Sequence, residues 1–405
     1  MTEAPPFHGC VAYTPATSIQ TPWQVGDMGL MREHFNQLAE LGVSHLLITP
    51  SWAHLQPQPN RIASRTMRFI EHCLDLAHQS HLSVIVSLLA IEHDGALTLP
   101  AWHNHADVVG WLQGRTTQPI HVVGSPALID GRWRSLQMAN PFTTAALVDA
   151  QHLLIRTVMG YFASHPACSW WLLAAGWSRL PGTTLPAHAA HWWQQLRETA
   201  LLAAPRAPVM SLIDGPTLTR QHALDMAVLA THSDMLVVNA AMPELTTRAQ
   251  RSLSAPALFS HELVHALSNK PVMVALPPLL MAQARASWQR VSWHQQALDV
   301  PCVPGEDAGL YLEHLLQQLH ASGCAGVIWP AAFPAPAHHA LPFVTWAAAQ
   351  WPLARHPGLL TPVGTAWARR FGQIQRVTAH TASIDSERYW HRPHAEFLRL
   401  WHTYA

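Results

Sequence analysis

The stretch MREHFNQLAELGVSHLLIT, residues Met31–Thr49, holds one expected helix and one expected strand in succession. Apolar residues recur at helical spacing over Met31–Leu41, and Gly42 follows as a stop signal. The apolar run His45–Thr49 then predicts a strand that is buried on both faces. A helix followed directly by such a strand is the repeating unit of a parallel α/β fold.

The same unit recurs along the whole chain. Eight short, mostly continuous apolar runs predict strands at Gly9–Tyr13, His45–Thr49, Ser83–Leu88, Ser169–Leu173, Pro208–Leu212, Met235–Asn239, Pro271–Ala275 and Gly326–Trp329. Amphipathic stretches predict further helices at Thr66–Gln79, Thr144–Ser164, His188–Ala203, Ser260–Leu267 and Leu310–Ala321. Eight alternations favour a closed (β/α)8 TIM barrel. Two segments, Ile91–Asn140 and Leu276–Gly309, follow strands and are expected as long loops at its C-terminal face.

Composition limits the classes of partner. The chain has 405 residues, with 24 Lys and Arg against 24 Asp and Glu. This neutral balance argues against nucleic acid or an anionic membrane surface, because both attract basic proteins. No apolar run approaches the roughly 20 residues that span a bilayer, so no membrane span is expected. The N-terminus lacks a basic segment followed by an apolar one, and five cysteines are scattered without paired spacing. We therefore expect a cytoplasmic protein with reduced thiols.

The end of the chain is expected to be helical. Within Glu387–Tyr404, the apolar residues Phe397, Leu400 and Trp401 recur at helical spacing. We expect a barrel over residues 1–380 and a C-terminal helical extension, residues 381–405, packed on it. Docking of another protein on this aromatic helix is the alternative.

Several phrases carry a family resemblance. They are LGVSHLLITPSWAHLQPQPNRI (Leu41–Ile62), LTLPAW (Leu97–Trp102), NPFTTAALVDAQHLLIRTVMGYFASHPACSWWLL (Asn140–Leu173), GVIWPAAFP (Gly326–Pro334) and HPGLLTPVGTAWARRF (His356–Phe371). Together, in this order, they resemble clan A glycoside hydrolases, the group of cellulases, β-mannanases and β-galactosidases. The resemblance implies a TIM barrel that performs retaining glycoside hydrolysis.

That chemistry needs two carboxyl groups about 5 Å apart. In the family the fourth strand ends in Asn-Glu, whose Glu is the acid/base, and the seventh ends in the Glu nucleophile. Here the matching positions hold Ala175 and Gly176, and Ala275. The sequence has no Asp or Glu between positions 149 and 198, nor between positions 262 and 299. Our first hypothesis is therefore a catalytically inactive barrel that binds a glycan or another protein, through its open face or its C-terminal helix.

Candidate ligand-binding side chains sit at or just after strand ends. The resemblance places Asn239 where the family has a sixth-strand His. Aromatic rings stack on sugars, so the candidates for substrate binding are Tyr13, Trp52, Trp102, Trp177, Asn239 and Trp329. The alternative is that the aromatic side chains fill a collapsed pocket.

Four acidic residues near strand ends keep a second hypothesis open, an active glycosidase with relocated carboxylates. These residues are Glu92, Asp94, Asp214 and Glu244. The hypothesis requires that two of them lie within about 5–9 Å across the pocket. Ordinary solvated loop positions are the alternative.

The motif H-E-x-x-H raises a third hypothesis, a zinc hydrolase. On a helix, His261 and His265 share one face and Glu262 lies beside them, which can hold zinc and activate water. The motif falls on an outer helix of the expected barrel, and no third ligand follows it. No phosphate-binding glycine loop or cysteine cluster is present either, so no cofactor is expected.

Overall fold

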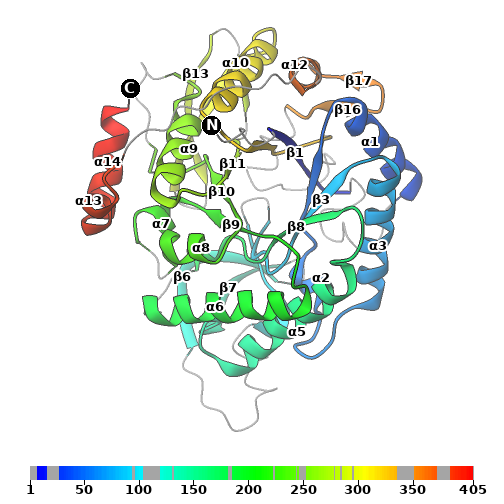
Figure 1. The fold of residues 1–405 in the computed structure, drawn as a ribbon, viewed down its shortest axis with the longest axis vertical. Coiled ribbons are helices and arrows are strands. Elements are labelled where there is room, and N and C mark those ends of the chain that lie inside the picture. The colour runs from blue at the N-terminus through cyan, green and yellow to red at the C-terminus, as the bar shows by residue number, and fades with distance from the viewer. Residues whose placement is uncertain are drawn as a thin grey trace.

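A closed barrel of eight parallel strands forms the centre of the computed structural model (Figure 1). The structure describes residues 7–15, 27–93, 96–103, 119–129, 132–180, 185–221, 224–242, 244–245, 252–277, 279–282, 285–293, 296–334, 351–371 and 384–404. The barrel strands are β1 (His8–Tyr13), β2 (His45–Ile48), β3 (Ser83–Ser87), β8 (Cys168–Leu172), β9 (Val209–Ile213), β10 (Met235–Asn239), β11 (Val272–Ala275) and β15 (Gly326–Trp329). Each expected strand is present, and β1 pairs with both β2 and β15 to close the ring. The predicted (β/α)8 fold is confirmed.

Alternate residues of each strand face the inside and the outside of the barrel. Cys10 of β1, Ile85 of β3 and Ile328 of β15 belong to the cluster that fills the interior. Their neighbours Val11, Val84 and Val327 pack in the larger cluster between strands and helices. Because both faces are buried, the strands read as continuous apolar runs.

Helices cover the outside of the barrel (Figure 1). Those of the barrel layer are α1 (Met28–Glu40), α2 (Trp52–Leu55), α3 (Ser64–Gln79), α5 (Ala145–Phe162), α6 (Pro186–Ala203), α7 (Gly215–Leu218), α8 (Met226–Thr231), α9 (Ala255–Ser268), α10 (Ala308–Ala321) and α12 (Pro362–Phe371). The start of α1 is fixed by a capping residue. The Asp27 side chain accepts from the backbone N–H groups of Gly29 and Leu30, so α1 begins earlier than expected. In the described part of the chain, no helix is both long and apolar enough to cross a membrane.

The two segments expected as loops contain strands instead. After β3 comes a four-stranded sheet of β4 (Glu92–His93), β5 (Ala96–Thr98), β6 (Pro119–Ile129) and β7 (Arg132–Ala139). A short helix, η1 (Ala101–His103), lies between β5 and β6. After β11 comes a three-stranded sheet of β12 (Leu280–Ala282), β13 (Ser287–Trp293) and β14 (Gln296–Pro304). The sequence held the missed signal for the first sheet, because Asp-Gly separates β6 from β7 and is a strong hairpin dipeptide.

The C-terminal segment forms two helices, where one was expected. They are α13 (Ser386–His391) and α14 (Pro393–Thr403), and they lie beside α9 and α7 at the left of Figure 1. The break follows from Pro393: the residue before a proline is disfavoured in helical geometry, and Arg392 has φ −142° and ψ 67°. A two-stranded piece, β16 (Ala354–His356) and β17 (Leu359–Leu360), precedes α12.

Candidate functional site

The strand ends where the sequence resemblance places the family's two glutamates hold small side chains. Ala175 follows β8, and Ala275 ends β11 between Asn239 and Ile328. Both methyl groups pack against the apolar cluster inside the barrel. Neither group can transfer a proton or attack an anomeric carbon, so these positions cannot supply the two carboxyl groups of retaining hydrolysis.

Gly176 differs from its neighbours in backbone conformation. Its φ is +79° and it precedes the short helix η2 (Trp177–Arg179). L-residues rarely adopt this left-handed region, whereas glycine does so at little cost. The turn after β8 is therefore built for a glycine.

The tryptophans expected to line a sugar site at the mouth of the barrel, where the C-terminal ends of its strands lie, are buried. Trp52, Trp102 and Trp177 are 0, 6 and 2 % exposed, and the rings of Trp52 and Trp102 meet edge to face at 5.6 Å. Their indole N–H groups donate to Gln56 Oε1, to the Gln56 carbonyl and to the Leu89 carbonyl, at 2.8, 2.8 and 2.6 Å. Their burial favours the packing interpretation over sugar stacking.

Trp329 and Tyr13 are also buried and bonded within the chain. Trp329 Nε1 donates to the Trp351 carbonyl at 3.0 Å, and Tyr13 Oη lies 3.2 Å from His34 Nδ1. Asn239 is partly exposed at the end of β10, and its Oδ1 accepts from the Ala241 backbone N–H. Among the candidate ligand-binding residues, Asn239 keeps an accessible polar side chain.

Two of the four candidate acids come together. Asp214 follows β9 and Glu244 follows β10, and the Glu244 carboxyl lies against the Cα of Gly215, where a β-carbon would overlap it. Burial raises the pKa of Glu244, and the Asp214 charge raises it further. Glu244 Oε2 is buried with no hydrogen-bond partner among the described residues. Asp94 and the Glu92 side chain lie outside the described part.

Asp214 is held by several hydrogen bonds. It accepts from Ser178 Oγ through Oδ2 and from the Thr217 backbone N–H through Oδ1, at 3.2 Å in the second case, and so caps α7. Ser178, Thr217 and Asp214 line a cavity of about 20 Å³ next to Gly176 and Trp193. A space of that size holds about one water molecule.

The H-E-x-x-H motif lies on α9, in the outer helix layer. His261 Nδ1 is 3.1 Å from Ser322 Oγ, and His265 Nδ1 is 2.9 Å from the Lys270 carbonyl. The two rings stack at 5.9 Å, whereas the Glu262 carboxyl accepts from the Tyr404 hydroxyl. No three potential ligands gather as a metal site in the part that the structure describes. The zinc site stays a prediction without a third ligand.

Two residues at the mouth went unnoticed in the sequence. Gln56 is fully buried and bonds Trp52, Pro59 and Ala150, so it joins the loop after β2 to α5. His103 is buried against the rings of Trp52 and Trp102, and both its ring nitrogens lack partners among the described residues. Burial lowers the pKa of His103 to about 3. No sequence signal marks either one, because polar residues in loops are usually solvated.

No protein-family model matches the chain, and the search of curated proteins finds no match. Solved structures do resemble it. A GH5_18 protein from Streptomyces cattleya, solved in complex with Manb1-4GlcNAc, is 18% identical with a TM-score of 0.72, over 98% of this chain and 91% of that one. GH5_18 from Bifidobacterium longum gives 19% and 0.70, over 92% and 81%. The exo-β-1,4-mannosidase Op5Man5 from Opitutaceae bacterium strain TAV5 gives 15% and 0.66, over 90% and 59%. The chain thus has the barrel fold of these glycoside hydrolase structures, as the sequence resemblance implied.

Proposed function

We propose that this chain is a catalytically inactive, glycosidase-like barrel that binds a carbohydrate at the C-terminal ends of its strands. The observation that carries the proposal is the pair Gly176 and Ala275 at the strand ends where the resemblance expects the acid/base and the nucleophile. Retaining hydrolysis requires both carboxyl groups, and removal of either one stops the double displacement.

Uncharged side chains at or just after the ends of β8, β10 and β11 support a neutral ligand. Ala175, Ala275 and Asn239 carry no charge, and Asn239 offers both a donor and an acceptor to a hydroxyl group. The fold is shared with a protein solved in complex with Manb1-4GlcNAc, which makes that disaccharide a suitable first probe. The buried aromatic rings of Phe397 and Trp401 pack on the chain's own Phe259, so we do not propose a protein partner at that helix.

The experiment has two parts. Aryl α- and β-glycosides are incubated with the protein, and binding of Manb1-4GlcNAc is measured by calorimetry on the wild type and on Asn239→Ala. We expect no hydrolysis and weak binding that Asn239→Ala reduces. Binding that is absent at millimolar disaccharide, or that ignores the substitution, contradicts the proposed site.

A second function is favoured by one observation: the Glu244 carboxyl lies against Gly215, the residue after Asp214, and the Asp214 charge raises the Glu244 pKa. A carboxyl group with a raised pKa can act as a general acid while its neighbour stays ionised. The second proposal is an active hydrolase that uses this pair. Turnover that is present in the wild type and lost in both Asp214→Asn and Glu244→Gln supports it. Absence of turnover in the wild type removes it.

Two further proposals accompany these. A cytoplasmic location is supported by the five cysteines, which are all described and all free. The zinc hydrolase has the least support, because the Glu262 carboxyl accepts from the Tyr404 hydroxyl and no third ligand joins His261 and His265 among the described residues. Elemental analysis of the purified protein tests it, and stoichiometric zinc that disappears in His261→Ala would restore it.

A further inference from the structure

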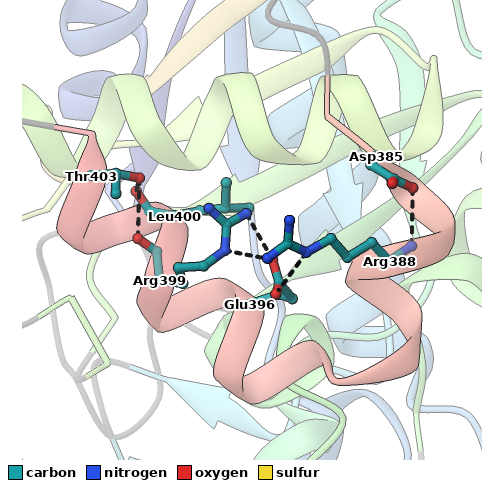
Figure 2. Close-up of polar contacts among 6 residues, drawn as sticks. All are labelled: Asp385, Arg388, Glu396, Arg399, Leu400 and Thr403. Carbon is teal, nitrogen blue, oxygen red and sulfur yellow. Dashed lines mark hydrogen bonds and ion pairs between the residues drawn. The ribbon is translucent and has the colours of Figure 1, made fainter.

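The C-terminal helix pair, α13 and α14, is fixed as a unit by its own polar contacts (Figure 2). Glu396 sits between two arginines: Arg388 Nε lies 3.1 Å from Oε1, and Arg399 Nη2 lies 2.7 Å from Oε2. These two guanidinium groups lower the pKa of Glu396, with Arg399 contributing most. The Asp385 side chain accepts from the Arg388 backbone N–H at 3.0 Å and caps α13. Two helices too short to be stable alone thus hold a defined angle.

One end of the pair is anchored on α9. The Phe259 ring meets those of Phe397, Trp401 and Tyr404 at 5.5, 5.1 and 5.2 Å. The Tyr404 hydroxyl bonds Glu262 of the same helix. The apolar face of α14 is therefore buried on the helix that precedes β11.

The other end of the pair, helix α13, contacts α7 and the turn after it. Tyr389 Oη, on α13, donates to the Leu218 carbonyl at 3.1 Å, and both groups are buried. The Arg220 guanidinium lies 4.4 Å from the Trp390 ring centre and donates to the Trp390 carbonyl at 3.1 Å. Arg220 has φ +52°, a conformation that a non-glycine residue keeps only when its surroundings hold it.

Helix α7 needs such support because it is a single turn of four residues. Asp214 caps it, and its first residue, Gly215, touches the Glu244 carboxyl. The helix pair bridges α7, which Asp214 caps, and α9, which follows Glu244 in the chain. We infer that the C-terminal helix pair is a positioning element that holds Asp214 and Glu244 together through Tyr389 and Trp390.

This inference concerns the geometry of Asp214 and Glu244. It rests on the second proposed function only in so far as these two carboxyl groups are catalytic. Loosening of α7 lets water reach Glu244 and moves the Asp214 charge away. Both changes bring the pKa of Glu244 down toward its ordinary value. A change in global stability alone does not have this effect on a folded sample.

The test is a carbon-13 NMR titration of the glutamate side-chain carboxyls in the full chain, with the Glu244 signal assigned through Glu244→Gln. Asp214→Asn gives the shift produced by removing the neighbouring charge. We expect Tyr389→Phe and Trp390→Ala to lower the pKa of Glu244 by about half a unit or more, as expected when a nearby charge and burial are weakened.

Tyr161→Phe is the matched control, because Tyr161 also donates through its hydroxyl, to Glu71, but on the distant helix α5. An unchanged Glu244 titration in folded Tyr389→Phe and Trp390→Ala overturns the inference, as does an equal shift in Tyr161→Phe. If Trp390→Ala does not fold, Tyr389→Phe decides alone, since it removes a single oxygen atom. The titration does not depend on hydrolysis. The helix pair can therefore fail as a positioning element while Asp214 and Glu244 remain catalytic, and it can position them although they are not catalytic.

Discussion

Replacement of Gln56 by leucine tests whether the aromatic side chains at the mouth form a fixed wall. Gln56 is fully buried, its Oε1 accepts from Trp52 Nε1, and its Nε2 donates to the carbonyls of Pro59 and Ala150, each at 2.8 Å. Leucine keeps most of the volume and removes all three hydrogen bonds. The indole N–H of Trp52 is then left buried without an acceptor.

The magnitude follows from these three groups. A buried N–H group that loses its only acceptor destabilises the folded state by about 1–3 kcal/mol. A carbonyl oxygen that keeps another hydrogen bond loses less. Ala150 lies inside α5, where the helical ladder already uses its carbonyl. We therefore expect Gln56→Leu to lower the free energy of unfolding by about 3 kcal/mol.

Urea unfolding followed by tryptophan fluorescence measures this change. Gln194→Leu is the control, because the Gln194 side chain donates to Glu198 on the exposed face of α6, where a change within about 0.5 kcal/mol is expected. A loss below about 1 kcal/mol in Gln56→Leu would refute the reasoning. It would mean that Trp52 is mobile enough to find water, and sugar stacking on that ring would regain support.

Three other changes have definite expected outcomes. Gly326→Ala places a β-carbon 2.5 Å from the His8 carbonyl oxygen inside the barrel, so we expect a loss of about 2–4 kcal/mol in urea unfolding. Gly160→Ala, with open space on helix α5, should instead gain up to about 1 kcal/mol. Acidification should lower the melting temperature: burial holds the pKa of His34, His45 and His261 near 4 and that of His103 near 3, whereas the unfolded value is about 6.5. Below pH 6.5 the unfolded chain binds more protons, so this stability is complete above pH 6.5 and is lost as the pH falls toward 4. A melting temperature that is equal at pH 7.5 and pH 5 would contradict the assignment of neutral, buried imidazoles.

The barrel could be read from the sequence because its strands are buried on both faces. Runs such as Met235–Asn239 are continuous and apolar, and the structure places β10 over the same residues. Burial on both faces also means that the sequence does not show which side chains point into the barrel and which point outward. Tyr13 and Trp329 stand at strand ends, but their alternation sends them outward to the helices. An apolar run without alternation gives no sign of that direction.

The candidate acids show a similar limit. Asp214 and Glu244 are 30 positions apart in the numbering, and no motif links them. They lie near each other because consecutive parallel strands, β9 and β10, end side by side. The inserted sheets could have been found in part, since Asp130-Gly131 is a hairpin signal, whereas the break at Arg392 needed attention to Pro393.

The left-handed turn at Gly176 has a consequence for variants of this chain that carry a glutamate at either strand end. Glycine and alanine codons that end in A or G become glutamate codons by one nucleotide change. Ala275 lies in an ordinary strand conformation at the end of β11 and could accept a glutamate. At position 176 a glutamate would have to bear a backbone strain of about 1–2 kcal/mol, or the turn after β8 would have to refold. The fold therefore accepts a glutamate more easily at position 275 than at position 176.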